Sequence, residues 1–201
     1  MNDRRDDRLD DFACIDECLK GSADSFGVLV DRYQDRIFAL VARMVSDPDA
    51  IRDLAQETFL LAYRGLSSFK RDSSFMTWLY RIAINVCQSE RRRRQRQRRI
   101  GTFGIGQSGD PDEPEREHAD VTTNPLDRLE EAERKRLLDA AMEAIDDDQR
   151  EIVTLRDFHG LSYQEIAEIL DCPVGTVRSR LFRARSEIRR RLERVLGGQD
   201  R

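Results

Sequence analysis

The sequence predicts an all-α fold made of two small helical domains joined by a flexible linker, and three observations support this. Apolar residues recur at three- and four-residue steps through most of the chain, which is helical periodicity, and no segment alternates as a strand does. Charged residues make up 37% of the 201 residues, above the roughly 25% of an average globular chain, so the exposed surface should be large. Residues 100–125 interrupt the helical pattern with four of the 11 glycines, three of the 5 prolines and many acids.

These observations divide the chain into four parts. Residues 1–23 should form a charged N-terminal tail and a short helix, and residues 24–99 a first helical domain. Residues 100–125 should be a flexible acidic linker, because they hold too few apolar residues to build a core. Residues 126–196 should form a second helical domain. Each domain is small and buries proportionally little surface.

The first domain is expected to contain three long helices. A frayed tail, residues 1–11, and a short helix from about Phe12 to Leu19 precede it. Asp24 or Ser25 suits the cap of the next helix, which carries apolar residues at helical spacing as far as Met44. The second helix should span about 49–65, with Asp47 as its cap and Pro48 at its first position. After a polar loop at 67–74, the third helix should begin near Ser74 and continue into the arginine-rich stretch 91–99.

The second domain should contain four helices, at about 126–144, 147–158, 162–170 and 174–196. Ser162 and Glu165 have the spacing of a capping box at the start of the third of these. A tight turn at 171–173 then leads into the last helix, which is the pattern of a helix-turn-helix.

The last helix has two distinct faces. Its apolar residues anchor one face, while Arg178, Ser179, Phe182 and Arg183 lie on the other. Arginine matches the acceptors of guanine in the major groove, serine can meet either base pair, and an aromatic edge can meet the methyl group of thymine. A solvated arginine face is the simpler alternative, but the cap, the turn and the basic second helix occur together and favour DNA binding.

The chain as a whole is acidic, but two arginine-rich segments could attract nucleic acid locally. The net charge is −4, yet residues 91–99 hold seven arginines and residues 178–194 hold eight against two acids. The chain has no apolar run of the roughly 20 residues that a membrane helix needs and no export signal, so we expect a cytoplasmic protein without membrane insertion. Cys14 and Cys18 are spaced i, i+4, and a zinc site built from the 4 cysteines and 2 histidines is the less favoured alternative; we expect no cofactor and no metal.

Two long motifs resemble extracytoplasmic-function (ECF) sigma factors of RNA polymerase. They are DAIRDLAQETFLLAYRGLSSFKRDSSFMTWLYRIAIN at 49–85 and DCPVGTVRSRLFRAR at 171–185. The resemblance covers about 24–96 and 126–195. It implies sigma region 2 in the first domain, sigma region 4 in the second and no enzymatic activity. Such a protein binds core RNA polymerase, reads the minus-ten and minus-thirty-five elements of promoter DNA as non-template single strand and as duplex, and supports promoter melting. The resemblance also allows for an anti-sigma factor as a partner.

The resemblance assigns roles to individual residues. The helical face that docks on the polymerase would carry Asp53, Gln56 and Glu57. The residues that bind the minus-ten element would be Phe69, Lys70, Arg71, Asp72 and Ser73 in the loop and Trp78, Arg81 and Asn85 on the next helix. Those that bind the minus-thirty-five element would be Thr176, Arg178, Ser179, Phe182 and Arg183.

Simpler interpretations stay open for several of these residues. The acidic face of Asp53 and Glu57 also suits ordinary solubility, and Trp78 also suits the core. Arg71 stands where the family often has glycine, and Ser89 stands where it often has an acid or an amide, so both could alter the preferred minus-ten sequence. The arginines at 91–99 fit upstream phosphates or a solvated helix end, and we favour phosphates.

Two other classes of protein compete with this interpretation. A stand-alone helix-turn-helix transcriptional regulator would explain residues 161–192 but leaves 49–89 without a role. An enzyme is disfavoured because the chain has no P-loop, no G-x-G-x-x-G, no H-E-x-x-H and no G-x-S-x-G motif.

Overall fold

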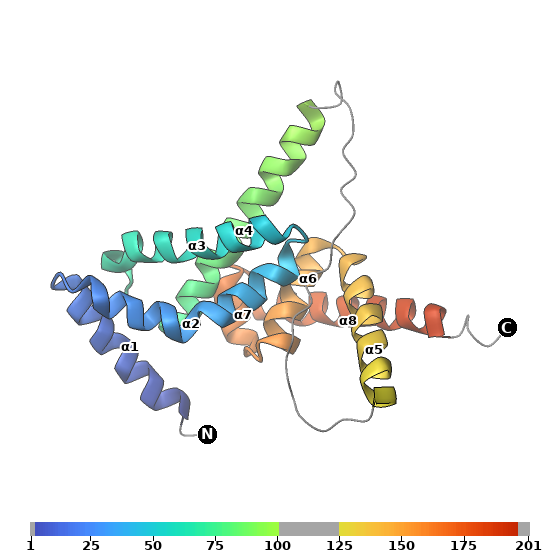
Figure 1. Cartoon of the computed structure of the whole chain (residues 1–201), viewed down its shortest axis with the longest axis horizontal. Helices are drawn as coiled ribbons and strands as arrows, with labels where there is room; N and C mark the ends of the chain where they lie inside the picture. The colour runs from blue at the N-terminus through green and yellow to red at the C-terminus, as the bar shows by residue number, and fades with distance from the viewer. Residues whose placement is uncertain (1–2, 101–124, 197–201) are drawn as a thin grey trace.

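The computed structural model describes residues 3–100 and 125–196, and every regular element within these ranges is a helix (Figure 1). The linker expected at 100–125 falls almost wholly outside the described residues. The elements are α1 (Asp3–Leu19), α2 (Ala23–Met44), α3 (Pro48–Gly65), η1 (Leu66–Ser68), α4 (Phe75–Ile100), α5 (Pro125–Glu143), α6 (Asp147–Val153), η2 (Thr154–Phe158), α7 (Tyr163–Ile169) and α8 (Val174–Leu196). Among the described residues, no helix is long and apolar enough to cross a membrane.

The first domain is a bundle of α1 to α4, and its local signals are those expected from the sequence. Asp47 caps α3, with its side chain accepting hydrogen bonds from the backbone N–H of Asp49 at 3.2 Å and of Ala50 at 3.5 Å, and Pro48 is the first helical residue. Ser74 precedes α4 and accepts from the N–H of Thr77 at 3.0 Å. The start of α2 differs, because the helix begins at Ala23, before the expected caps at Asp24 or Ser25.

Helix α1 is longer than the sequence predicted. We expected a frayed tail up to residue 11, whereas the helix runs from Asp3. A tertiary contact supports the helix at Asp11, inside the expected tail: the carboxylate of Asp11, 1% exposed, accepts hydrogen bonds from Tyr33 Oη at 2.6 Å and from Arg32 at 2.7 Å on α2. Because its charge is compensated in this way, Asp11 can be buried and α1 can continue through it.

The second domain contains the predicted helix-turn-helix. Ser162 and Glu165 form the capping box of α7, with the Ser162 hydroxyl accepting from the Glu165 N–H at 3.2 Å and the Glu165 carboxylate accepting from the Ser162 N–H at 2.7 Å. The turn before α8 contains Asp171 with φ of 47°, a left-handed conformation that aspartate tolerates better than most residues. The helix expected at 147–158 is divided, because α6 ends at Val153 and continues as the π-helical turn η2.

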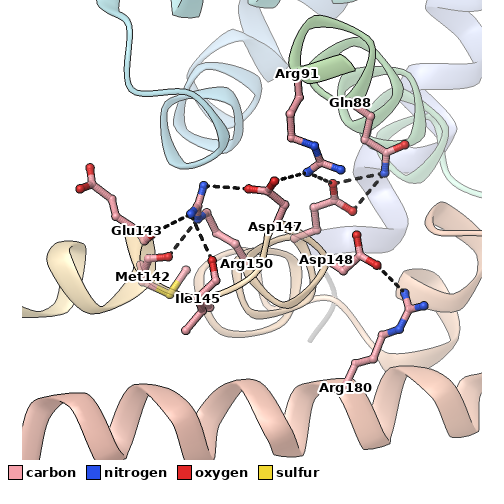
Figure 2. Close-up of polar contacts among 10 residues, drawn as sticks. Gln88, Arg91, Met142, Glu143, Ile145, Asp147, Asp148, Arg150 and Arg180 are labelled. Atoms are coloured by element: carbon pink, nitrogen blue, oxygen red, sulfur yellow. Dashed lines mark hydrogen bonds and ion pairs between the residues drawn. The ribbon is translucent and has the colours of Figure 1, made fainter. Parts of the chain in front are cut away.

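The two domains pack against each other in this structure, which the sequence did not predict. Tyr80 Oη on α4 lies 2.8 Å from His159 Nδ1 at the end of η2, and the Arg43 guanidinium on α2 lies 3.4 Å from the centre of the Phe158 ring. Helix α6 faces α4 through polar side chains: Figure 2 shows Gln88 and Arg91 of α4 pointing toward it. Beyond these contacts, the C-terminal end of α4 projects away from the other helices (Figure 1).

Candidate DNA and polymerase interfaces

Helix α8 presents the two faces that the sequence predicted. Val177, Leu181 and Ala184 are buried against the rest of the domain. Thr176 is half-buried near the start of the helix, and the opposite face exposes Arg178, Ser179, Phe182 and Arg183. Phe182 is 74% exposed, the largest exposed fraction among the exposed large apolar side chains of the described residues, and it lies on the same face as the two arginines.

The arginines of α8 fall into two groups by their partners. Arg180 lies 3.7 Å from Asp148 (Figure 2), Arg185 pairs with Asp157, and Arg190 and Arg191 pair with Glu187. Within the described residues, Arg178 and Arg183 make no ion pair with a carboxylate. The sequence suggests Arg180, Arg185 and Arg189 for phosphate contact, and of these Arg180 and Arg185 are engaged with acids of the same domain. Arg178 and Arg183, the two assigned to base reading, are thus among the α8 arginines that no described acid neutralises, together with the exposed Arg189 and Arg194.

The loop between η1 and α4 is attached to an aromatic cluster. The centre of the Phe69 ring lies 5.0 Å from that of Trp78, 6.0 Å from that of Phe75 and 6.3 Å from that of Phe12. Phe69 and Trp78 are half-buried, whereas Phe75 is fully buried. The alternative of a core role for Trp78 thus holds for part of its surface, and both rings keep some exposed surface.

The other candidate residues of the loop differ in their exposure and in their hydrogen-bond partners. Lys70 and Asp72 are exposed, and Ser73 is half-buried with its hydroxyl donating to the Ser74 carbonyl at 3.3 Å. Arg71 has a left-handed backbone, with φ of 63°, and its guanidinium donates to both carboxylate oxygens of Asp16 on α1. This guanidinium holds the pKa of the Asp16 carboxyl below its usual value.

Arg81 and Asn85 lie on the exposed face of α4, as expected. The Arg81 guanidinium donates to the backbone carbonyl of Glu168 at the end of α7. The neighbouring Ser89 hydroxyl donates to the backbone carbonyl of Asn85 at 2.8 Å, so its hydrogen-bond donor is used within α4. With the domains packed in this way, helix α7 lies beside part of the face proposed to meet the minus-ten strand.

The arginine-rich end of α4 is partly neutralised by acids. Glu90, 9% exposed, accepts hydrogen bonds from Arg93 Nε at 2.6 Å and from Arg94 Nε at 2.7 Å. These bonds lower the pKa of the Glu90 carboxyl to about 2. Arg94 also pairs with Asp47 at 2.9 Å, which ties the end of α4 to the cap of α3. Part of the arginine run therefore has a structural role, and Arg98 and Arg99 lie outside the residues whose side chains are described.

The face of α3 that carries Asp53, Gln56 and Glu57 is exposed. The three residues are spaced i, i+3 and i+4, so their side chains lie on one side of the helix, while Leu54 and Thr58 are buried on the other. This face offers acids and an amide to a partner.

Comparison with known proteins decides the family. Residues 29–97 match the family model described as Sigma-70 region 2, and residues 135–188 match that for Sigma-70, region 4. The chain is 38% identical over 196 residues to the ECF RNA polymerase sigma-E factor of Escherichia coli (strain K12), an alignment that covers 94% of this chain and 98% of the relative. The protein belongs to the ECF sigma factor family. It therefore directs promoter recognition by RNA polymerase and is not an enzyme.

Further relatives are similar to this sigma factor over most of its length, in sequence or in structure. The ECF RNA polymerase sigma-E factor of Haemophilus influenzae is 37% identical over 190 residues, covering 94% of this chain and 99% of the relative. The sigma factor RpoE of Bartonella quintana, solved in complex with the anti-sigma factor NepR, is similar with a TM-score of 0.64 and 26% identity over 85% of this chain and 98% of that one. CnrH, solved with the cytosolic domain of CnrY, is similar with a TM-score of 0.62 and 25% identity over 93% and 97%.

The contacts that join sigma region 2 to sigma region 4 are the part of the structure that the sequence did not reveal. Glu151, 4% exposed, accepts from Gln88 Nε2 at 3.1 Å and lies 3.4 Å from Arg91, and its burial raises the pKa of its carboxyl. Burial also lowers the pKa of His159 to about 4, so the ring is neutral at pH 7. His159 directly follows the helix expected at about 147–158, and no sequence signal connects it with Tyr80. Among the described residues, no group of histidine, cysteine and acidic side chains is arranged to hold a metal ion.

Proposed function

We propose that this sigma factor reads a promoter at two places, with α8 at the minus-thirty-five element and the loop and exposed face of α4 at the minus-ten element. The observation that carries the first half is the exposed face of α8, where Arg178 and Arg183 are unneutralised beside an exposed Phe182. Such a face can enter the major groove of duplex DNA, with arginine donating to guanine O6 and N7.

For the minus-ten element, we propose that Phe69, Lys70, Arg71, Asp72 and Ser73 of the loop and Trp78, Arg81 and Asn85 of α4 contribute to binding an opened non-template strand. A base that leaves the stack must regain stacking and hydrogen bonds, and half-buried aromatic rings next to polar loop atoms offer both. The α3 face of Asp53, Gln56 and Glu57 would dock on core polymerase, which holds the two readers at the spacing of the promoter.

We also propose that the protein acts in the cytoplasm and that an anti-sigma factor controls it. The similar sigma factor RpoE was solved in complex with the anti-sigma factor NepR, and CnrH was solved with the cytosolic domain of CnrY. Run-off transcription with core polymerase over a promoter library tests the activity and identifies the promoter together. A stand-alone regulator would instead bind its site tightly in a gel-shift assay without polymerase.

Replacing Arg178 or Arg183 with alanine should weaken selection of the minus-thirty-five element by about 1–3 kcal/mol each, the usual contribution of a bidentate contact with a base. The measurement is the ratio of transcription from a mapped promoter to that from its minus-thirty-five mutants. Arg190→Ala is the matched control, because this arginine lies on the same helix but pairs with Glu187. Equal ratios for the native protein and both variants would remove α8 as the reader.

A further inference from the structure

Arg71 has a backbone conformation that needs support. Its φ of 63° is one of only two positive values among the non-glycine residues that the structure describes. The left-handed region costs an ordinary side chain roughly 1 kcal/mol, so a residue held there depends on its surroundings. Arg71 is in the middle of the loop proposed to read the minus-ten element.

The support comes from α1, a helix outside the residues that match the region 2 family model. Phe12 and Asp16 are four residues apart and therefore share one face of α1. Asp16 accepts two hydrogen bonds from the Arg71 guanidinium, whose centre lies 5.4 Å from the centre of the Phe12 ring. The same Phe12 ring lies beside Phe69, two residues before Arg71.

The other side of the loop is held by α4. Phe69 packs against Trp78 and Phe75 of that helix, and Ser74 forms its cap. The loop is thus fixed between two helices, with Arg71 turned toward α1 and with Lys70 and Asp72 left exposed. A guanidinium that donates to a carboxylate in this way is less available to DNA than an unpaired one.

We propose that Asp16 is a positioning residue for promoter reading: by holding Arg71 against α1, it sets the conformation of the loop and so the bases accepted at the minus-ten element. Arg71 then contributes to minus-ten binding indirectly, by fixing the conformation of the loop. The inference rests on the proposed function, because it requires that this loop meets the minus-ten element.

The test is transcription by holoenzyme over a library of promoters randomised at the minus-ten element. Asp16→Ala and Arg71→Ala should each reduce discrimination between preferred and disfavoured minus-ten bases by about two- to fivefold, the range of an exposed ion pair. The exchanged pair, Asp16→Arg with Arg71→Asp, should restore most of the native preference. Discrimination at the minus-thirty-five element should not change in any of these variants.

Two control variants separate the possible results. Glu17→Ala removes an exposed ion pair between α1 and Lys20, the residue that follows this helix, and should leave the minus-ten profile native. If Asp72→Ala changes the profile while Asp16→Ala does not, the positioning role is wrong and the proposed minus-ten function stands. If Asp72→Ala, Asp16→Ala and Arg71→Ala all leave it native, both fail. A uniform loss of transcription without altered base preference, or an exchanged pair that restores nothing, would likewise overturn the positioning role.

Discussion

A variant with both Asp53→Arg and Glu57→Arg should bind core RNA polymerase at least about a hundredfold more weakly, because truncating or reversing charges in a docked interface costs roughly 2–5 kcal/mol or more. The two acids are exposed on α3 and make no contribution to the core. Folding should therefore survive. Titration of labelled sigma factor with core polymerase measures the affinity, and the circular dichroism spectrum and unfolding midpoint check the fold.

Asp31→Arg with Asp35→Arg is the matched control for this experiment. Both acids are exposed on α2 with the same four-residue spacing, so the variant carries the same change in net charge on another face. The control should bind polymerase with near-native affinity. If the two double variants lose affinity equally, the effect comes from overall charge and not from a docking face on α3.

Lowering the pH from 7 to 5 should destabilise the packed form of this sigma factor through His159. Burial lowers the pKa of this histidine to about 4, against an ordinary value near 6.5, with Arg43 and Arg36 adding to the shift. The packed state therefore binds the proton less well than a state with a hydrated ring. Stability is present above the ordinary pKa and is lost as the pH falls toward 4, by about 2 kcal/mol at pH 5.

Glu151 acts in the opposite direction at the same interface. Burial raises the pKa of its carboxyl, so its contribution to stability is present at low pH and falls as the pH rises. The pH dependence of the stability of the native protein is the sum of the contributions of His159 and Glu151. The part that belongs to His159 is obtained by subtracting the pH dependence of a His159→Gln variant.

Urea unfolding followed by the fluorescence of Trp78 measures this difference. Trp78 is the sole tryptophan of the chain and lies in the first domain, whereas His159 lies in the second. A change in the Trp78 transition on protonation of His159 therefore reports that the two domains are coupled. Identical pH dependence in the native protein and in His159→Gln would show that the ring is hydrated in solution and that the contact with Tyr80 does not form.

Local structure was largely predictable from the sequence because its determinants are close together along the chain. The cap at Asp47, the capping box of Ser162 and Glu165 and the two faces of α8 each depend on residues a few positions apart. The acid that pairs with the arginine run was visible in the same way. Glu90 stands three and four residues before Arg93 and Arg94, which is the spacing of helical ion pairs.

The contacts between distant segments could not be predicted in this way. Asp11 is buried only because Tyr33 and Arg32 lie beside it on another helix, and His159 becomes a partner of Tyr80 only when the two domains meet. Arg71 was assigned to DNA from its place in the loop, while its partner Asp16 stands 55 residues earlier in the chain. Composition and periodicity carry no information about such pairs.

The acids beside the arginines bear on how this sigma factor should respond to ionic strength. A cationic side chain that binds a phosphate strengthens complex formation by releasing condensed counterions from DNA, and the number released sets the slope of log affinity against log salt concentration. Arg93 and Arg94 already pair with Glu90, and Arg190 and Arg191 pair with Glu187. To bind a phosphate, each of these arginines must first give up its carboxylate partner. The slope should therefore be shallower than the arginine content of α4 and α8 alone indicates.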